Sequence, residues 1–344
     1  MFCKFSTPAI RSRQAWRLLL LASTDFADEN MLYAAPESSR RCMKSMGELY
    51  KHPEEYDLEH LGDSDDIDFY VSLARKLKPR RILELGCGTG RITLPLAEEG
   101  ARLGSEVVGL DSQSEMLDKA ANRRLQAPPE VRERFALIEA DMRAWRADSP
   151  FDLVVTPCSS VTHLLSVQDQ LTVWKLCRSN LAPNGRFVVE VMMPNMAVFA
   201  DSFQVPVRTP VEVDIDKFDE SDGIRLIRRK TTHYLSDDQR AQTRFLYEKY
   251  KDGPAIEQYI DDFAGHVYFP RELELLFMHS GFEVEHTFGD FPGKTTAKFA
   301  LDYHDRQTRM TTGCVFKAET SIDYWAELDG KKQSFQVPVE TRFQ

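Results

Sequence analysis

Short apolar runs alternate with helically spaced segments along residues 64–191. Between Ser64 and Leu77 the apolar residues recur every three or four positions, which predicts a helix that Pro79 ends. Five apolar runs predict strands at 81–85, 106–110, 136–139, 153–156 and 186–191. The stretches between them predict helices over 92–99, 114–124 and 166–181. Strands that alternate with helices favour a parallel sheet with helices on both faces.

The pattern changes after Pro194. Residues 211–216 alternate with period two, and 224–234 and 244–250 have strand composition, which together predict antiparallel strands with one solvent-facing side. We interpret 197–263 as an inserted β-rich lid over the carboxyl edge of the parallel sheet. A helix is expected from Pro270 to Gly281. The runs at 282–288 and 310–317 are expected to be the last two strands of the main sheet.

Composition excludes several classes of function. The chain has 344 residues and a formal net charge of −10. This negative charge argues against a protein that binds nucleic acid through clustered Lys and Arg. Its six cysteines are scattered, so neither a disulfide framework nor a zinc site is indicated. The apolar run at 18–22 is too short to span a membrane. We therefore expect no nucleic acid, no membrane and no metal among its partners.

The segment ILELGCGTGR (82–91) places three glycines directly after a predicted strand. A glycine turn between a strand and a helix lets backbone N–H groups approach a ligand near the positive end of the helix. The dinucleotide fingerprint spaces its last two glycines by two residues. Here Gly86, Gly88 and Gly90 are separated by one residue each, and Glu84 precedes them. Alone, the loop is compatible with NAD, FAD, S-adenosylmethionine or tight packing.

Two carboxylates follow at the ends of the next predicted strands. Asp111 ends the second strand, where a carboxylate can accept hydrogen bonds from both hydroxyls of a ribose. Asp141 ends the third strand, where it can accept from an exocyclic amine such as that of adenine. Each residue alone is compatible with a cap or a turn. Three consecutive strand ends with this chemistry predict a nucleotide-like ligand.

These segments resemble the class I S-adenosylmethionine-dependent methyltransferases. The resemblance is carried by ELGCGTGR (84–91), VVGLDSQSEML (107–117), EADM (139–142), FDLVV (151–155) and LAPNGRFVVEV (181–191). It implies a Rossmann-like fold and S-adenosylmethionine as cofactor. The glycine loop would line the methionine moiety, Asp111 the ribose, and Asp141 with Met142 the adenine, while Glu84 would orient the loop. The cofactor residues implied are Tyr50, Glu84, Gly86, Cys87, Gly88, Gly90, Asp111, Ser112, Met116, Asp141, Met142 and Thr156.

The segment PCSSVTHL (157–164) follows the fourth strand and is expected to border both cofactor and acceptor. It is similar to small-molecule N-methyltransferases, including glycine N-methyltransferase and amino-sugar N-methyltransferases. The resemblance implies that His163 borders the acceptor as a catalytic residue, with Tyr50 or Tyr56 as the partner tyrosine. The alternative for His163 is a packing or capping role. His266 and Glu190 are weaker candidates for the same cleft, with packing and solvent exposure as their alternatives.

The resemblance also implies a division of the chain. The Rossmann-like domain is expected to comprise 46–196 and 264–317, with a seven-stranded, mostly parallel sheet and the antiparallel lid at 197–263. Residues 1–45 are expected to be a flexible leader and 318–344 a C-terminal extension. We expect a cytoplasmic protein. The alternative is a mitochondrial one, because residues 1–24 are Arg-rich and lack acids, as in a transit peptide.

The hypothesis drawn from the sequence is methyl transfer to a small molecule by direct in-line displacement. An amine acceptor is favoured over a hydroxyl, and a role in secondary metabolism and a homodimer are compatible with the pattern. Two alternatives remain at this point: an NAD-dependent oxidoreductase, and a methyltransferase-like protein that binds without turnover.

Overall fold

The computed structural model describes residues 50–192, 194, 196–202, 210–235, 238–287, 301–304, 309–310, 323–328 and 331–336. The expected leader at 1–45 and the expected strand at 310–317, apart from Met310, lie outside these residues. Within the expected C-terminal extension, β13 (Asp323–Leu328) pairs antiparallel with β14 (Lys331–Gln336).

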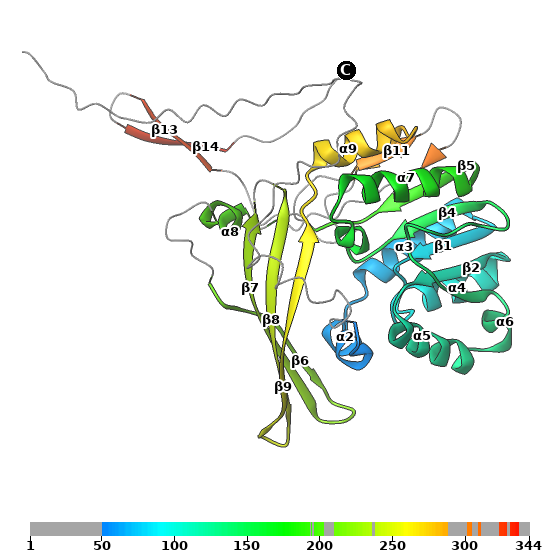
Figure 1. Cartoon of the computed structure of the whole chain (residues 1–344), viewed down its shortest axis with the longest axis horizontal. Helices are drawn as coiled ribbons and strands as arrows, with labels where there is room; N and C mark the ends of the chain where they lie inside the picture. Colours follow the sequence, from blue (N-terminus) through cyan, green and yellow to red (C-terminus); the bar gives the residue numbers. More distant parts are fainter. Residues whose placement is uncertain are drawn as a thin grey trace, which may run out of the picture. The chain divides into compact units, whose positions relative to one another are not determined.

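A five-stranded parallel sheet forms the first layer (Figure 1). Its order is β3-β2-β1-β4-β5, which confirms the predicted α/β architecture. The strands are β1 (Arg81–Leu85), β2 (Glu106–Asp111), β3 (Phe135–Glu139), β4 (Phe151–Thr156) and β5 (Leu181–Val189). The helices connected to them are α2 (Pro53–Glu59), α3 (Asp65–Leu77), α4 (Thr93–Leu103), α5 (Ser114–Gln126), α6 (Pro129–Arg132), α7 (Val167–Asn180) and α9 (Pro270–His279).

The first of the two strands expected to complete a seven-stranded sheet, at 282–288, does not extend the parallel sheet in the described residues. Instead β10 (Val284–Thr287) pairs antiparallel with β11 (Leu301–His304), which pairs with β12 (Arg309–Met310). A register shift interrupts the pairing of β10, and irregularities of this kind end regular ladders. The small sheet still lies beside β5, because Glu285 of β10 binds Arg186 of β5 at 2.9 Å.

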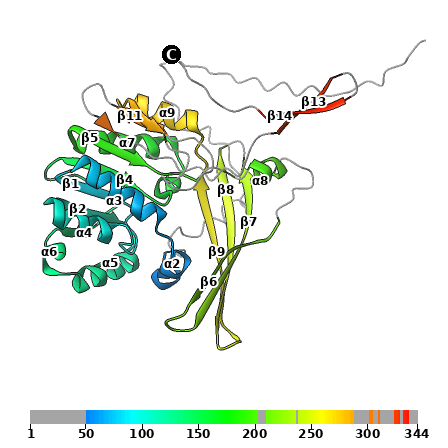
Figure 2. The ribbon, with the colours of Figure 1, turned by 180° about the vertical axis from the view of Figure 1, so that it is seen from behind.

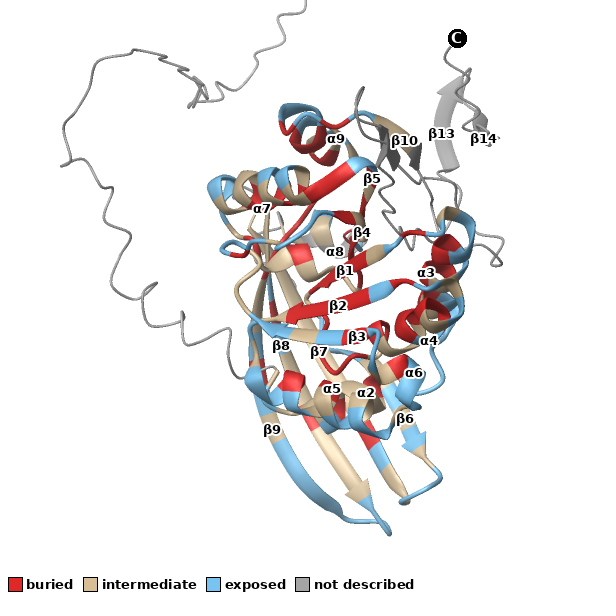
Figure 3. Cartoon of the chain, turned by 90° about the vertical axis from the view of Figure 1, so that its right-hand side faces the viewer, coloured by how far each residue is buried: buried red, intermediate tan, exposed pale blue. Residues whose placement is uncertain are grey.

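Apolar side chains fill both faces of the parallel sheet. Successive residues of a strand point to opposite faces, so Val188 joins the cluster under α3 and α4 while Val189 joins the cluster under α7 and α9. Trp174 and Phe277 form the centre of the second cluster and are fully buried. Figure 3 shows β1, β2 and β5 as mostly buried strands. The carboxyl ends of these strands are therefore held rigidly at one edge.

A separate antiparallel sheet occupies most of the predicted insertion. Its order is β6-β7-β8-β9, with β6 at Glu212–Asp219, β7 at Ile224–Leu235, β8 at Arg240–Lys251 and β9 at Ala255–His266. A short helix, α8 (Met196–Asp201), precedes it. The sequence pattern indicated β6 to β8 but not β9. That strand carries several acids and a glycine, residue types that are depleted in strands.

The helix α2 lies between this sheet and the parallel sheet, as both Figure 1 and Figure 2 show. Toward the antiparallel sheet, Glu59 binds Arg228 at 2.6 Å and Glu55 binds Lys249. In the other direction, Asp57 accepts a hydrogen bond from the Thr89 hydroxyl of the glycine loop at 2.7 Å. Glu55 and Glu59 are buried, so both depend on their cationic partners for compensation.

We expect Arg228→Met to lower the free energy of unfolding by roughly 3–5 kcal/mol, because Glu59 would stay buried without its partner. The matched control is Arg225→Met, whose ion pair with Asp216 is about half exposed (51% and 43%). This control should cost less than about 1 kcal/mol. Chemical denaturation measures both variants, and equal effects would contradict the importance of the α2 contact.

Candidate functional site

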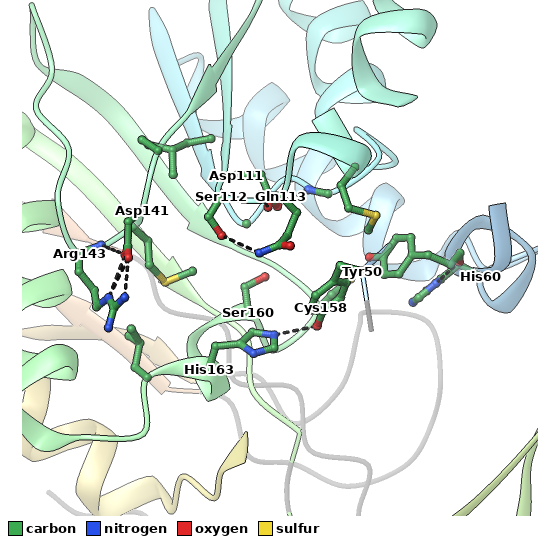
Figure 4. A pocket seen from close by; sticks show the side chains of 18 residues that line it. Tyr50, His60, Asp111, Ser112, Gln113, Asp141, Arg143, Cys158, Ser160 and His163 are labelled. Carbon is green, nitrogen blue, oxygen red and sulfur yellow. Dashed lines mark hydrogen bonds and ion pairs between the residues drawn. The ribbon is translucent and has the colours of Figure 1, made fainter. Parts of the chain in front are cut away.

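A pocket opens at the carboxyl edge of the parallel sheet (Figure 4). Loops after β1, β2, β3 and β4 form its walls, and residues before and within α2 close one side. Its lining is Tyr50, Tyr56, His60, Gly86, Gly88, Leu110, Asp111, Ser112, Gln113, Met116, Ala140, Asp141, Met142, Arg143, Cys158, Ser160, His163 and Leu164. Eight of the twelve cofactor residues proposed from sequence are therefore brought together, and so is His163.

The glycine loop can approach the pocket only because it lacks side chains. Gly86 has φ +73, and an added Cβ would lie 2.7 Å from the Ser160 hydroxyl oxygen. An added Cβ at Gly88 would come within 3.3 Å of Met116 and 3.9 Å of Tyr56, two residues that line the pocket. Backbone atoms thus form this wall, as required for a ligand that is bound by N–H groups.

Asp111 joins two parts of the pocket wall. Its carboxylate accepts hydrogen bonds from the Gly88 N–H at 2.8 Å and the Gln113 N–H at 2.9 Å. Burial raises the pKa of Asp111, and the backbone donors oppose this by stabilising the charged form. The side chain borders the pocket, so its remaining acceptor positions are placed for a ligand's hydroxyl groups.

Asp141 lies at the next strand end and is held by Arg143, which was not predicted from the sequence. Arg143 donates to it through Nε at 2.9 Å and through a terminal nitrogen at 2.6 Å. The guanidinium holds the pKa of Asp141 below its usual value. Arg143 itself lines the pocket together with Met142. The only sequence signal for Arg143 is its place two residues after the strand-end carboxylate.

The other four proposed cofactor residues do not line the pocket. Cys87 is buried against Gly109, and burial raises the pKa of its thiol. Gly90 packs against Ala120, and the Thr156 hydroxyl donates to the Val188 carbonyl at 3.3 Å. These three positions support the loop and the sheet beneath the pocket.

Glu84 is also buried below the glycine loop. Its carboxyl group accepts a hydrogen bond from the Thr93 hydroxyl at 2.6 Å. Burial raises the pKa of Glu84 to about 8. The contact ties the end of β1 to the first residue of α4, which fixes both ends of the loop.

His163 and Tyr50 meet in the wall of the pocket (Figure 4). The Tyr50 hydroxyl lies 2.7 Å from Nε2 of His163, so Tyr50, of the two tyrosines considered, contacts the histidine directly. Phe263 of β9 packs edge-on against the imidazole with 5.3 Å between ring centroids. Burial lowers the pKa of His163 to about 4, so the ring is neutral at pH 7.

His266 occupies a different environment. It is buried, its Nε2 lies 2.7 Å from a Glu272 carboxylate oxygen, and it does not line the pocket. Glu190 also lies outside the lining and is bonded to Tyr70. Over the described ranges, no group of three or more His, Cys, Asp or Glu residues could hold a metal. No helix in the same part of the chain is long and apolar enough to cross a membrane.

Comparison with known proteins agrees with this fold. A family model described as a methyltransferase domain matches residues 82–185. Trans-aconitate 2-methyltransferase of Streptomyces avermitilis is 34% identical over 113 residues, which are 33% of this chain and 39% of that relative. The chain spans about half or less of the length of the curated relatives it matches.

Two solved structures share the fold. DesVI of Streptomyces venezuelae has a TM-score of 0.57 at 21% identity, over 74% of this chain and 98% of DesVI. The sugar N-methyltransferase KedS8 from Streptoalloteichus has a TM-score of 0.54 at 16% identity, over 76% of this chain and 95% of KedS8.

The fold is therefore that of S-adenosylmethionine-dependent methyltransferases. Within this chain, residues 82–185 match a methyltransferase domain, and S-adenosylmethionine is the cofactor of that class. The match to a methyltransferase domain argues against the alternative of an NAD-dependent oxidoreductase. The narrow spacing of the glycines argues against it as well.

We expect Asp111→Ala to weaken S-adenosylhomocysteine binding at least about 100-fold. The variant loses the acceptor of the Gly88 N–H and the groups placed for a ribose, and each hydrogen bond to a charged group is worth about 1.5–3 kcal/mol. Isothermal titration calorimetry measures the affinity. Asp148→Ala is the control, because the Asp148 side chain is 87% exposed and remote from the lining. Unchanged affinity in Asp111→Ala would refute the placement of the ribose.

His163 should stay neutral in the folded protein from pH 8 down to about pH 5, because burial lowers its pKa to about 4. Nuclear magnetic resonance of the imidazole, assigned by comparison with His163→Gln, should show no titration of this ring in that range. A midpoint near the unperturbed value of about 6.5 would show that the ring is solvated.

Proposed function

We propose that the protein transfers a methyl group from S-adenosylmethionine to a small-molecule acceptor, and that this acceptor is an amine. The arrangement of His163 and Tyr50 carries the proposal: both line the same pocket as the glycine loop and Asp111. A ligand bound along the glycine loop would lie between this loop and the histidine. The acceptor would then approach from the side of His163.

The residues of the pocket fit this cofactor. The side-chain-free wall at Gly86 and Gly88 suits its methionine portion, Asp111 its ribose, and Asp141 with Met142 its adenine. Ser112, Met116 and Tyr50 complete the surroundings, whereas Glu84, Cys87, Gly90 and Thr156 act by supporting them. When bound, S-adenosylmethionine supplies an activated methyl group on a sulfonium.

The protein's own contribution would be to align the acceptor lone pair with that methyl group. Positioning of this kind contributes about 7–11 kcal/mol in favourable cases. A histidine with a pKa of about 4 is a weak base, so it gives little help to an acceptor that must lose a tightly held proton. A neutral amine needs no base in the transfer step, and this favours nitrogen over a hydroxyl oxygen. His163 would orient the acceptor, with Tyr50 fixing the imidazole.

The likeness to a sugar N-methyltransferase supports the proposal of an amine on a sugar-like molecule. A role in secondary metabolism is part of the same proposal. We also propose that 197–263 acts as the lid on the acceptor side, since β9 brings Phe263 against His163. A cytoplasmic location and a homodimer stay predictions from the sequence.

The test is release of S-adenosylhomocysteine with a panel of amino sugars, simple amines, phenols and sugar alcohols. Turnover is expected with members that carry an amine, and His163→Ala should lower kcat roughly 10- to 100-fold with cofactor affinity retained. His279→Ala, an exposed histidine on α9, is the control. Turnover confined to hydroxyl acceptors would overturn the nitrogen assignment. Binding of S-adenosylhomocysteine without turnover on any acceptor would favour the non-catalytic alternative.

A further inference from the structure

The short 3-10 helix Ser160–His163 packs against the end of β9 and the residues that follow it. The hydroxyl of the buried Tyr268 donates a hydrogen bond to the Val161 carbonyl at 3.0 Å. At the next residue of the helix, a Cβ added to Gly265 would lie 3.6 Å from the Thr162 Cβ, which is an ordinary contact distance. The end of β9 therefore sets the position of this helix.

Phe263, two residues before Gly265, packs against the last residue of the same helix. Its ring lies edge-on to the imidazole of His163, with 5.3 Å between the centroids and an interplanar angle of 86°. The ring of Phe245, on the neighbouring strand, lies 6.5 Å from that of Phe263. His163 thus contacts a polar group, the Tyr50 hydroxyl at 2.7 Å, and an apolar ring, that of Phe263. Together the two contacts orient the imidazole.

The position of the Phe263 ring depends on the missing side chain at Gly265. Residues two apart in a strand point to the same face of the sheet. A Cβ added to Gly265 would lie 2.6 Å from Cε1 and 2.7 Å from Cζ of Phe263, which is too close for van der Waals contact. Gly265 lies inside β9 and outside the positive-φ region, so its backbone does not require glycine. A glycine inside a strand weakens the strand and often marks the close approach of another group. Here that group is the Phe263 ring.

The same ring contributes to the burial of His163. Burial lowers the pKa of His163 to about 4, and water that reached the imidazole would favour its charged form. Tyr50 is the titratable group that contacts the imidazole, and burial raises its pKa, so its hydroxyl stays neutral at pH 7. From β9 the imidazole meets the uncharged ring of Phe263. Displacement of this ring would therefore act on His163 through access of water.

We propose that Phe263 and Gly265 are positioning residues for His163. The absence of a side chain at Gly265 lets the Phe263 ring lie along β9 against the imidazole, and this contact holds His163 in one orientation at the pocket. The consequence for turnover rests on the function proposed above. The packing itself does not depend on the identity of the acceptor.

The first test is Gly265→Ala, because alanine fits an extended strand and adds only the Cβ that meets the ring. Nuclear magnetic resonance should show altered signals of the His163 imidazole. The pKa of His163 should rise from about 4 towards the value of about 6.5 that a solvated histidine has. With an acceptor that is turned over, kcat should fall roughly 10-fold while S-adenosylhomocysteine affinity is retained, since Gly265 and Phe263 do not line the pocket. Unchanged His163 signals would overturn the proposal.

The control is Gly223→Ala, in the turn between β6 and β7. An added Cβ there meets nothing within 4 Å, but the φ of +73 makes alanine strained at this position. The variant should therefore weaken the antiparallel sheet without displacing Phe263, and its His163 signals should match those of the wild type. Equal changes of these signals in Gly223→Ala and Gly265→Ala would trace the effect to general destabilisation of the sheet and would contradict the proposal.

A double variant decides whether Gly265 acts through Phe263. Phe263→Ala alone should raise the pKa of His163, because the apolar ring is lost. In this background the ring that an added Cβ would displace is absent, so Gly265→Ala should change the His163 signals no further. Additive effects of the two substitutions would show that Gly265 acts by another route, against the proposal.

If Gly265→Ala does not fold, Phe263→Leu and Phe263→Ala give the decision. Leucine keeps most of the apolar volume, so the pKa of His163 should stay low in Phe263→Leu and rise in Phe263→Ala. The same low pKa in both variants would refute a role of the ring.

The two proposals can fail separately. Absence of S-adenosylhomocysteine binding and turnover in the wild type would refute the proposed function, while the His163 signals of the variants would still decide the packing role. Normal turnover by the wild type, with His163 signals unchanged in Gly265→Ala and Phe263→Ala, would refute only the positioning role.

Discussion

The hydrogen bond from the Gly88 N–H to the Asp111 carboxylate joins the turn after β1 to the end of β2, and the pocket is built around it. Parallel strands end at a common edge, so loops from four of them meet at this point. Because Gly86 has no side chain, the loop after β4 can place Ser160 directly on the glycine loop. A larger residue at Gly86 would separate the two halves of the pocket.

Ion pairs and hydrogen bonds of acidic side chains attach the remaining elements to this edge of the parallel sheet. The seven-residue helix α2 is too short to be stable alone, and acids on its different sides bind different partners. Glu55 and Glu59 bind cations of the antiparallel sheet, while Asp57 binds Thr89 of the glycine loop and Arg123 of α5. One short helix thus connects the acceptor side to the cofactor loop.

Much of this arrangement could be predicted from local pattern. The five parallel strands, the glycine loop and the strand-end carboxylates were all predicted, because apolar periodicity and turn chemistry act over a few residues. Arg143 was not identified as a pocket residue, because only its place two residues after Asp141 marks it, and Cys158 was predicted only as part of the segment 157–164. They reach the pocket only through the turns that follow β3 and β4.

The sequence by itself determined the α/β class, the cofactor loop and the candidate pair of His163 with an N-terminal tyrosine. Only the tertiary structure decided that this tyrosine is Tyr50, that His163 is kept neutral by burial, and that Glu190 accepts a hydrogen bond from Tyr70. It also decided that β10 pairs outside the parallel sheet. Periodicity reports which face of an element is buried, whereas hydrogen-bond partners and desolvation depend on residues that are distant in sequence and become neighbours only on folding.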